Sequence, residues 1–113
     1  MFYVDFITSE KTYKLRLTTR NVVTLEKQLG CNPLSIFGDG ETIPTIGTMV
    51  TVLHSSLQAL EHGITLDKTY EIFDSWLSEG HNAVEFVNII LEIYKASGLI
   101  PNTETAEGDE KNE

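Results

Sequence analysis

The chain has 113 residues, 41% of them hydrophobic, which is typical of one domain with its own core. Its formal net charge of −9 repels phosphate backbones and anionic lipid headgroups, so we expect neither nucleic acid nor a membrane as partner. The sequence has no recognisable signal peptide and no run near the ~20 apolar residues of a membrane span, and its single cysteine excludes an intramolecular disulfide, so we expect a cytoplasmic protein.

Two segments near the N-terminus, residues 2–7 and 12–18, have an apolar side chain at every second position, as in strands with one face in water. The polar residues 8–11 between them are enough for a turn. We therefore predict a β-hairpin, and its apolar face must pack on the rest of the domain because an isolated hairpin is marginally stable. The residues of that face are Phe2, Val4, Phe6, Tyr13, Leu15 and Leu17.

The next part of the chain predicts a helix, a short connecting piece and a second helix. The first helix is capped by Thr18 or Thr19 and runs to Leu29, where Gly30 ends it. A short turn or helical piece spans residues 32–37, and 38–41 form a loop. After a cap at Thr45, an apolar stripe with spacings of three and four predicts a helix that ends near residue 62. The stripe consists of Ile46, Val50, Leu53, Leu57 and Leu60.

Two further helices follow. One begins at Thr65 or Asp67 and ends at Gly80, with an apolar face formed by Tyr70, Phe73, Trp76 and Leu77. The last begins at a capping box of Asn82 and Glu85 and ends before Gly98. It is apolar around most of its circumference, which is typical of a helix that is central in the fold or covered by another chain.

These elements predict an α+β fold, mainly α: an N-terminal β-hairpin followed by four or five helices. We expect one globular domain over residues 1–100. Residues 101–113 are almost entirely polar and acidic, and they offer too little apolar surface to offset the entropy of ordering. We therefore expect a disordered acidic tail there.

Side chains able to carry out chemistry are few and poorly spaced. His54 and His62 are eight residues apart, whereas two metal ligands on one helix normally lie three or four apart. Cys31 follows a helix C-terminus, where the helix dipole disfavours a thiolate. The loop 38–41 lacks the Gly-Lys-Ser/Thr ending of a phosphate loop and the spacing of a calcium loop. We expect no enzyme activity, no catalytic residues, no metal and no cofactor.

Five of the eight basic residues fall between positions 11 and 27. They form either a modest basic patch for an acidic partner or, in the simpler interpretation, a solvated strand face and first helix turn. The five are Lys11, Lys14, Arg16, Arg20 and Lys27.

Residues 13–30 resemble the opening of the tail assembly chaperones of long-tailed (siphovirus-type) bacteriophages and prophages. In that family a strand of the form Leu-Arg-Leu-Thr, here residues 15–18, leads into a helix that contains Leu-Glu and ends in Leu-Gly, here residues 25–26 and 29–30. A later helix follows a cap like Ile43-Pro44-Thr45, and another carries a Tyr…Leu…Gly pattern like Tyr70 to Gly80. The resemblance covers roughly residues 12–98, and its motifs are mainly turns, caps and core positions.

The resemblance implies a binding protein without catalysis. Such chaperones bind and solubilise the tape measure protein in the host cytoplasm during tail morphogenesis and are absent from the mature virion. The tail tube protein and a second copy of the chain are further candidate partners. One alternative is a structural tail or head–tail connector subunit that stays in the particle. Another is a small regulator or adaptor that binds a host protein.

The apolar surface of the last helix is the candidate binding surface, because such a surface suits a groove for a partner helix. Part of this set must belong to the core in a domain of this size. The candidate partner-binding residues are Trp76, Phe86, Ile89, Ile90, Ile93 and Tyr94.

The family often also has a longer form made by programmed ribosomal frameshifting. Residues 110–112, Glu-Lys-Asn, are compatible with codons that contain an A-AAA-AAY slippery heptamer. An ordinary polar tail explains the same three residues equally well, and only the native codons distinguish the two.

Overall fold

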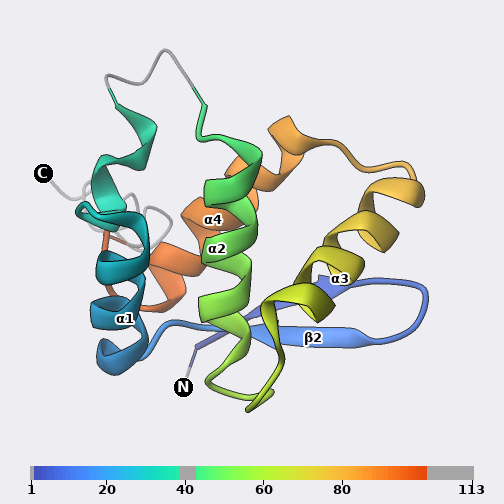
Figure 1. The fold of residues 1–113 in the computed structure, drawn as a ribbon, viewed down its shortest axis with the longest axis horizontal. Helices are drawn as coiled ribbons and strands as arrows, with labels where there is room; N and C mark the ends of the chain where they lie inside the picture. Colours follow the sequence, from blue (N-terminus) through green and yellow to red (C-terminus); the bar gives the residue numbers. More distant parts are fainter. Residues whose placement is uncertain (1, 39–42, 102–113) are drawn as a thin grey trace, which may run out of the picture.

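The computed structural model describes residues 2–38 and 43–101, in which a hairpin is followed by helices (Figure 1). This confirms the α+β, mainly α fold class. The expected tail, apart from Pro101, and most of the expected loop 38–41 lie outside the described residues. In chain order the elements are β1 (Val4–Ile7), β2 (Thr12–Leu15), α1 (Thr19–Leu29), the 3₁₀ helix η1 (Pro33–Phe37), α2 (Ile46–Leu57), α3 (Leu66–Ser78) and α4 (Ala83–Ala96).

β1 and β2 are antiparallel, with Val4 opposite Leu15 and Phe6 opposite Tyr13. The turn between them is closed at Thr8, whose N–H donates to the Lys11 carbonyl at 3.0 Å. The inner face of the hairpin is buried at Phe6, Tyr13, Leu15 and Leu17 and partly buried at Val4. Phe2, which we expected on this face, precedes β1 and is 74% exposed.

The link from the hairpin into α1 follows the sequence signals closely. The Thr18 hydroxyl accepts the Asn21 N–H at 3.1 Å, and the Asn21 side chain accepts the Thr18 N–H at 3.3 Å, which completes a capping box. At the other end, Gly30 adopts the left-handed conformation with φ 74° and donates its N–H to the Glu26 carbonyl at 2.8 Å. A side chain with a Cβ is disfavoured there, which explains the glycine.

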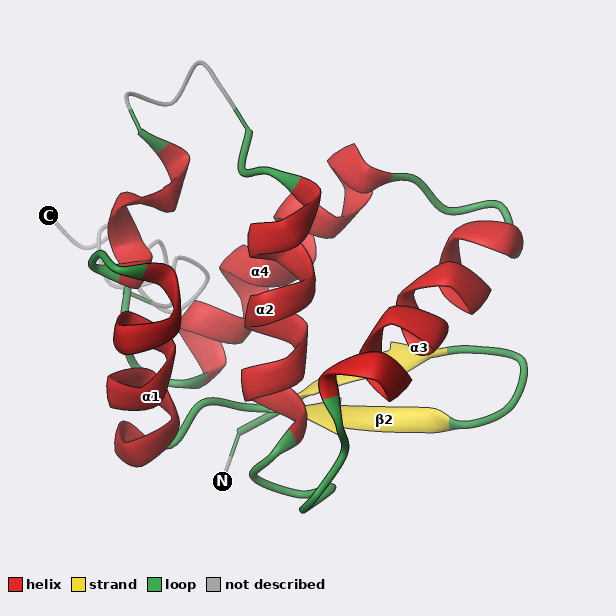
Figure 2. Ribbon diagram, viewed as in Figure 1, coloured by secondary structure: helices red, strands yellow, loops and turns green. Residues whose placement is uncertain are grey.

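The central helix is α2 rather than α4. It contacts α1, α3, α4 and β2, and Figure 2 shows it between α1 and α3. Small polar side chains make this possible: Ser56 is fully buried, and its hydroxyl donates to the Leu53 carbonyl at 2.9 Å. The buried residues of α2 are Met49, Val50, Val52, Leu53, Ser55, Ser56 and Leu57.

Three positions of the predicted helical apolar faces are exposed. Ile46 is the first residue of α2 and is 50% exposed, and Leu60 lies beyond the end of that helix and is 42% exposed. On α3, Tyr70 is 47% exposed, while Thr69 is fully buried beside it. The Thr69 hydroxyl donates to the Thr65 carbonyl at 2.9 Å, so this polar side chain can occupy a core position with its hydrogen bond made.

A buried hydrogen bond joins η1 to α4. The Tyr94 hydroxyl donates to the Pro33 carbonyl at 2.8 Å, and the Tyr94 ring meets the Phe37 ring edge-on at a centroid distance of 6.2 Å. Burial, with a smaller effect from Cys31, raises the pKa of Tyr94 well above its ordinary value. The neutral phenol is therefore the form that the folded protein stabilises.

We expect Ile90→Asp to abolish folding at 25 °C. Ile90 is fully buried, and an unpaired carboxylate in its place costs several kcal/mol, a large share of the 5–15 kcal/mol that is typical of a domain. Val84→Asp is the matched control on the same helix. Val84 is 63% exposed in the first turn, so this change should alter the free energy of unfolding by no more than about 0.5 kcal/mol. Circular dichroism and urea titration measure both, and a cooperatively folded Ile90→Asp protein would contradict the assignment of Ile90 to the core.

We expect Tyr94→Phe to lower the free energy of unfolding at pH 7 by about 1 kcal/mol, because it leaves the buried Pro33 carbonyl without its donor. The difference in the free energy of unfolding between wild type and Tyr94→Phe should decrease above about pH 10. In wild type the unfolded chain ionises Tyr94 there while the folded chain resists ionisation, so this contribution is present below pH 10 and is lost as pH rises. Urea titrations between pH 7 and 11 measure the difference, and a constant difference would contradict the burial of a neutral phenol.

Candidate functional site

The structure places five of the six candidate partner-binding residues in the core. Trp76 is 2% exposed, and the remaining four have no exposed surface: Phe86, Ile90, Ile93 and Tyr94. Only Ile89 is partly exposed. In this conformation the other five side chains are core residues, and α4 presents its flank at the surface.

An aromatic cluster of Phe6, Phe73, Trp76 and Phe86 explains this burial. The Phe6 ring centroid lies 5.3 Å from that of Trp76 and 5.9 Å from that of Phe86, and the Phe73 and Phe86 centroids are 5.1 Å apart. Such edge-on and tilted pairs are favourable beyond the apolar area that they bury. The side chains expected to hold a partner instead hold α3 and α4 against the inner face of β1.

Other large apolar side chains are exposed, and none of them was among the six candidates. Three lie in or just before β1: Phe2 is 74%, Tyr3 46% and Ile7 62% exposed. On α3, Leu66 and Tyr70 are four residues apart and so lie on one side of the helix. The others are Val23, Leu34, Ile43, Ile46, Leu60 and Val84.

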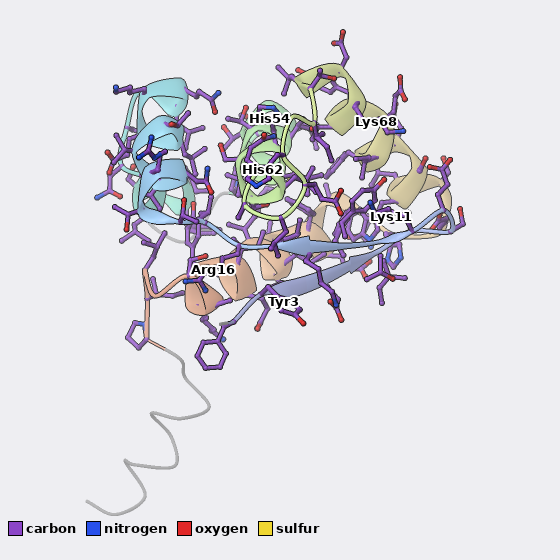
Figure 3. The ribbon with its side chains drawn as sticks, turned by 90° about the horizontal axis from the view of Figure 1, so that it is seen from below. Tyr3, Lys11, Arg16, His54, His62 and Lys68 are labelled. Carbon is purple, nitrogen blue, oxygen red and sulfur yellow. The ribbon has the colours of Figure 1, made fainter. Side chains whose placement is uncertain are left out.

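The two edges of the hairpin differ. Because Thr8 and Lys11 form a hydrogen-bonded pair and such pairs alternate along an antiparallel ladder, Phe6 and Val4 pair with β2, while Asp5 and Ile7 direct their N–H and C=O groups outward. We call the outward groups of Asp5 and Ile7 the β1 edge. Within residues 2–38 and 43–101, no hydrogen bond from outside the hairpin reaches them. In Figure 3, β2 lies on the side of α2 and α3, and β1 lies on the other side.

Elsewhere on the hairpin, at β2 and at the turn, other parts of the fold form hydrogen bonds with it. On the β2 side, the Arg16 N–H donates to the Ser56 carbonyl of α2 at 3.0 Å. At the turn, the Ser9 N–H donates to the Glu79 carboxylate at 2.8 Å. This hydrogen bond lowers the pKa of Glu79, because it favours the charged form.

Two open hollows follow β1, and we call them together the edge groove. The first, of about 420 Å³, is lined by Asp5, Phe6, Ile7, Trp76, Glu79, His81, Glu85 and Ile89. The second, of about 390 Å³, is lined by Phe2, Tyr3, Val4, Glu92, Lys95, Ala96, Gly98 and Ile100. On α4, positions 85, 89, 92 and 96 have the spacing of one helix face. The edge groove therefore runs between β1 and one flank of α4.

His81 and Glu85 form a polar pair in the first hollow. The His81 Nδ1 atom lies 2.8 Å from the Glu85 carboxylate, and the imidazole stacks on Trp76 at a centroid distance of 4.5 Å and an angle of 3°. Glu85 was predicted to complete a capping box with Asn82. Asn82 does accept the Glu85 N–H at 2.9 Å, but the Glu85 side chain contacts His81.

Several of the basic residues at positions 11–27 have partners within the protein. Lys11 pairs with Glu61 at 2.9 Å and Lys14 with Asp5 at 2.7 Å. The Arg16 guanidinium donates to the carbonyls of Phe2 and Ala96 at 2.8 and 3.2 Å. These contacts favour the simpler interpretation of a solvated strand face over a patch that awaits an acidic partner.

The histidines and the cysteine do not form a cluster among the residues that the structure describes. The His54 Nε2 atom lies 3.0 Å from the Ile64 carbonyl, and Cys31 is exposed. Over the part of the chain that the structure describes, no three His, Cys, Asp or Glu side chains are grouped so as to hold a metal ion.

Comparison with protein families identifies the family to which the chain belongs. A family model described as Family of unknown function (DUF6096) matches residues 7–110, and the chain belongs to this family. No curated protein and no solved structure matches the chain. None of the helices described here is both long enough and apolar enough to cross a membrane.

The contact between Glu79 and the hairpin turn can be tested by titration. We expect the Glu79 carboxyl to titrate below its ordinary pKa, and the Ser9 amide resonance to shift with the same midpoint, because the two groups share a hydrogen bond. The stabilisation is present above the ordinary carboxyl range and is lost as pH falls through the lowered pKa. In Glu79→Gln the Ser9 amide should lose this acid transition in NMR spectra. A Ser9 transition that persists in the variant would contradict the contact.

Proposed function

We propose that this chain is a bacteriophage tail assembly chaperone, which binds and solubilises the tape measure protein in the host cytoplasm and is absent from the mature virion. The observation that carries the proposal is the amount of apolar side chain left on the surface of a strongly acidic domain. Phe2, Ile7 and Val84 each expose more than three-fifths of their surface, on a chain with a net charge of −9.

Such a surface suits a protein that holds an aggregation-prone chain. Exposed apolar side chains provide contact area for a hydrophobic client. The acidic charge keeps the binder and its complex soluble through mutual repulsion. The combination supports a holding role.

The sequence resemblance is the second support. The residues that carry it include Thr18, which caps α1, Gly30, which ends α1, and Thr45, which caps α2. These features specify local structure, so they support a family relationship and do not identify the bound protein. The choice of the tape measure protein as client rests on the resemblance alone. The tail tube protein and a second copy of the chain remain further candidate partners.

The exposed pair on α3 gives the proposal a surface that can be tested. Leu66 and Tyr70 are 42% and 47% exposed on one side of the helix. Both can be changed without opening the core, because the buried residues of α3 are Thr69, Ile72, Phe73 and Trp76. Asp74 is exposed on the same helix and serves as a polar control position.

Co-expression with the tape measure protein of the same genome tests the proposal. We expect a soluble complex with several copies of this chain per tape measure protein, observed by affinity purification and size-exclusion chromatography. Leu66→Ser combined with Tyr70→Ser should reduce the soluble tape measure protein several-fold, because two apolar contacts are removed. Asp74→Ser should leave it unchanged.

The contrary outcome is equally concrete. A tape measure protein that stays insoluble with this chain and with any longer frameshifted form, together with a fixed copy number of this chain in purified virions, would contradict the proposal. That pair of results would assign the chain to the structural subunits of the tail or the head–tail connector.

A further inference from the structure

We propose that the β1 edge binds an extended, basic segment of a partner protein, which adds to the hairpin as a third strand and lies in the edge groove. This inference does not depend on the proposed function, because it concerns how the surface binds and leaves the identity of the partner open. It rests on three features: outward backbone groups, a hollow beside them, and the charge of that hollow.

The backbone groups come first. Asp5 and Ile7 each direct one N–H and one C=O away from β2, and within the described ranges 2–38 and 43–101 these groups have no hydrogen-bonding partner outside the hairpin. Unpaired edge groups are a template for another strand, and proteins often cover them or keep the edge short. Here the edge is short, yet Ile7 exposes 62% of its surface directly on it.

The space beside the edge has the form that an added strand requires. The two hollows of the edge groove lie along β1 and are bounded by the α4 flank at Glu85, Ile89 and Glu92. In a strand that pairs with β1, alternate side chains face this flank, and the others lie beside Asp5 and Ile7. Ile89, half-buried on the flank, provides an apolar contact for the inward-facing side chains.

The negative charge of the groove favours a positively charged partner segment. Of the eight residues that line the larger hollow, three are carboxylates, Asp5, Glu79 and Glu85, and none is lysine or arginine. Lys14 pairs with Asp5 from β2, His81 contacts Glu85, and Glu79 accepts the Ser9 N–H. The smaller hollow adds Glu92 and Lys95, which lie 3.5 Å apart, and the Arg16 guanidinium contacts the carbonyls of Phe2 and Ala96 on its lining. The acidic surplus therefore lies at the larger hollow, and a basic segment is complementary to that part of the groove.

A second copy of the chain is a less suitable occupant. Antiparallel pairing of two β1 strands about Phe6, the centre of the β1 edge, places Asp5 of each copy opposite Ile7 of the other, so the carboxylate meets no cation. It also brings together two chains that each carry a net charge of −9, which repel each other. A lysine or arginine of a basic partner strand meets the same carboxylates favourably.

Two single substitutions at Ile7 separate strand addition from general attraction. Ile7→Pro removes the outward N–H and leaves the hydrogen-bonded pair of Phe6 and Tyr13 intact, which is the position where an edge strand tolerates proline. Ile7→Thr is the matched control, since it keeps the N–H and the β-branched shape. The fold of both variants is checked by circular dichroism.

The probe is a short, acetylated and amidated peptide of alternating lysine and valine, measured by fluorescence anisotropy at physiological salt. We expect it to bind wild type and Ile7→Thr with affinities within about threefold of each other, and Ile7→Pro about tenfold more weakly, because at least one hydrogen bond is lost. The same peptide with a central proline, and a peptide with glutamate in place of lysine, should each bind wild type at least about tenfold more weakly.

NMR on the wild-type protein keeps the test decisive if Ile7→Pro does not fold. On titration with the lysine peptide, the amide resonances of Asp5 and Ile7 should shift more than those of Thr12 and Lys14 on the opposite edge. Undetectable binding, equal binding to a folded Ile7→Pro variant, or shifts spread evenly over the acidic surface would overturn the proposal. A concentration-dependent dimer that Ile7→Pro abolishes, with no peptide bound, would overturn it in favour of a second copy.

Discussion

The fold depends on covering the inner face of the hairpin. A two-stranded sheet is marginal by itself, and Phe6 alone contributes about 1.5–3 kcal/mol when it is fully buried. The rings of Trp76 and Phe86 provide that cover from α3 and α4, and α2 packs against β2. Because these side chains are committed to the core, the surface available for binding lies elsewhere, on the outer edge of β1 and on exposed positions of the helices.

Local sequence signals predicted most of the element boundaries. Thr18, Thr45, Thr65 and Asn82 each cap a helix where the sequence placed a cap, because a side-chain oxygen that accepts an early N–H is a local feature. The alternation of Tyr13, Leu15 and Leu17 likewise identified the inner face of the hairpin. These predictions needed only residues close together in the chain.

The relative placement of the helices could not be predicted in the same way. α4 carries more large apolar side chains than one stripe requires, and we expected it to be either central in the fold or covered by another chain. The central helix is α2, because Ser55 and Ser56 are small enough to be buried against neighbours and Ser56 satisfies its own hydroxyl on the Leu53 carbonyl. Hydropathy periodicity does not identify such serines as core positions. It counts every serine as polar, including one whose hydroxyl is hydrogen-bonded within its own helix and can therefore be buried.

The candidate site was predictable only in part. That some of the apolar residues on α4 belong to the core followed from domain size, but which of them do so depends on the aromatic contacts with Phe6, and these join residues about 70–80 positions apart. The β1 edge was not predicted at all. Its outward groups depend on which residues of the hairpin form hydrogen-bonded pairs and on what the helices leave uncovered, and neither is a property of a single segment.

Amide hydrogen exchange in the isolated protein tests the central claim most directly. The account predicts slow exchange for Val4 and Phe6, whose N–H groups pair with β2, and exchange faster by orders of magnitude for Asp5 and Ile7, which alternate with them on the same strand. Neighbours on one strand share its local opening, so the comparison is internally controlled. Equal protection at all four positions would show that the outer edge of β1 is already covered, and would contradict both the edge groove as a binding site and the assignment of the hairpin's open side.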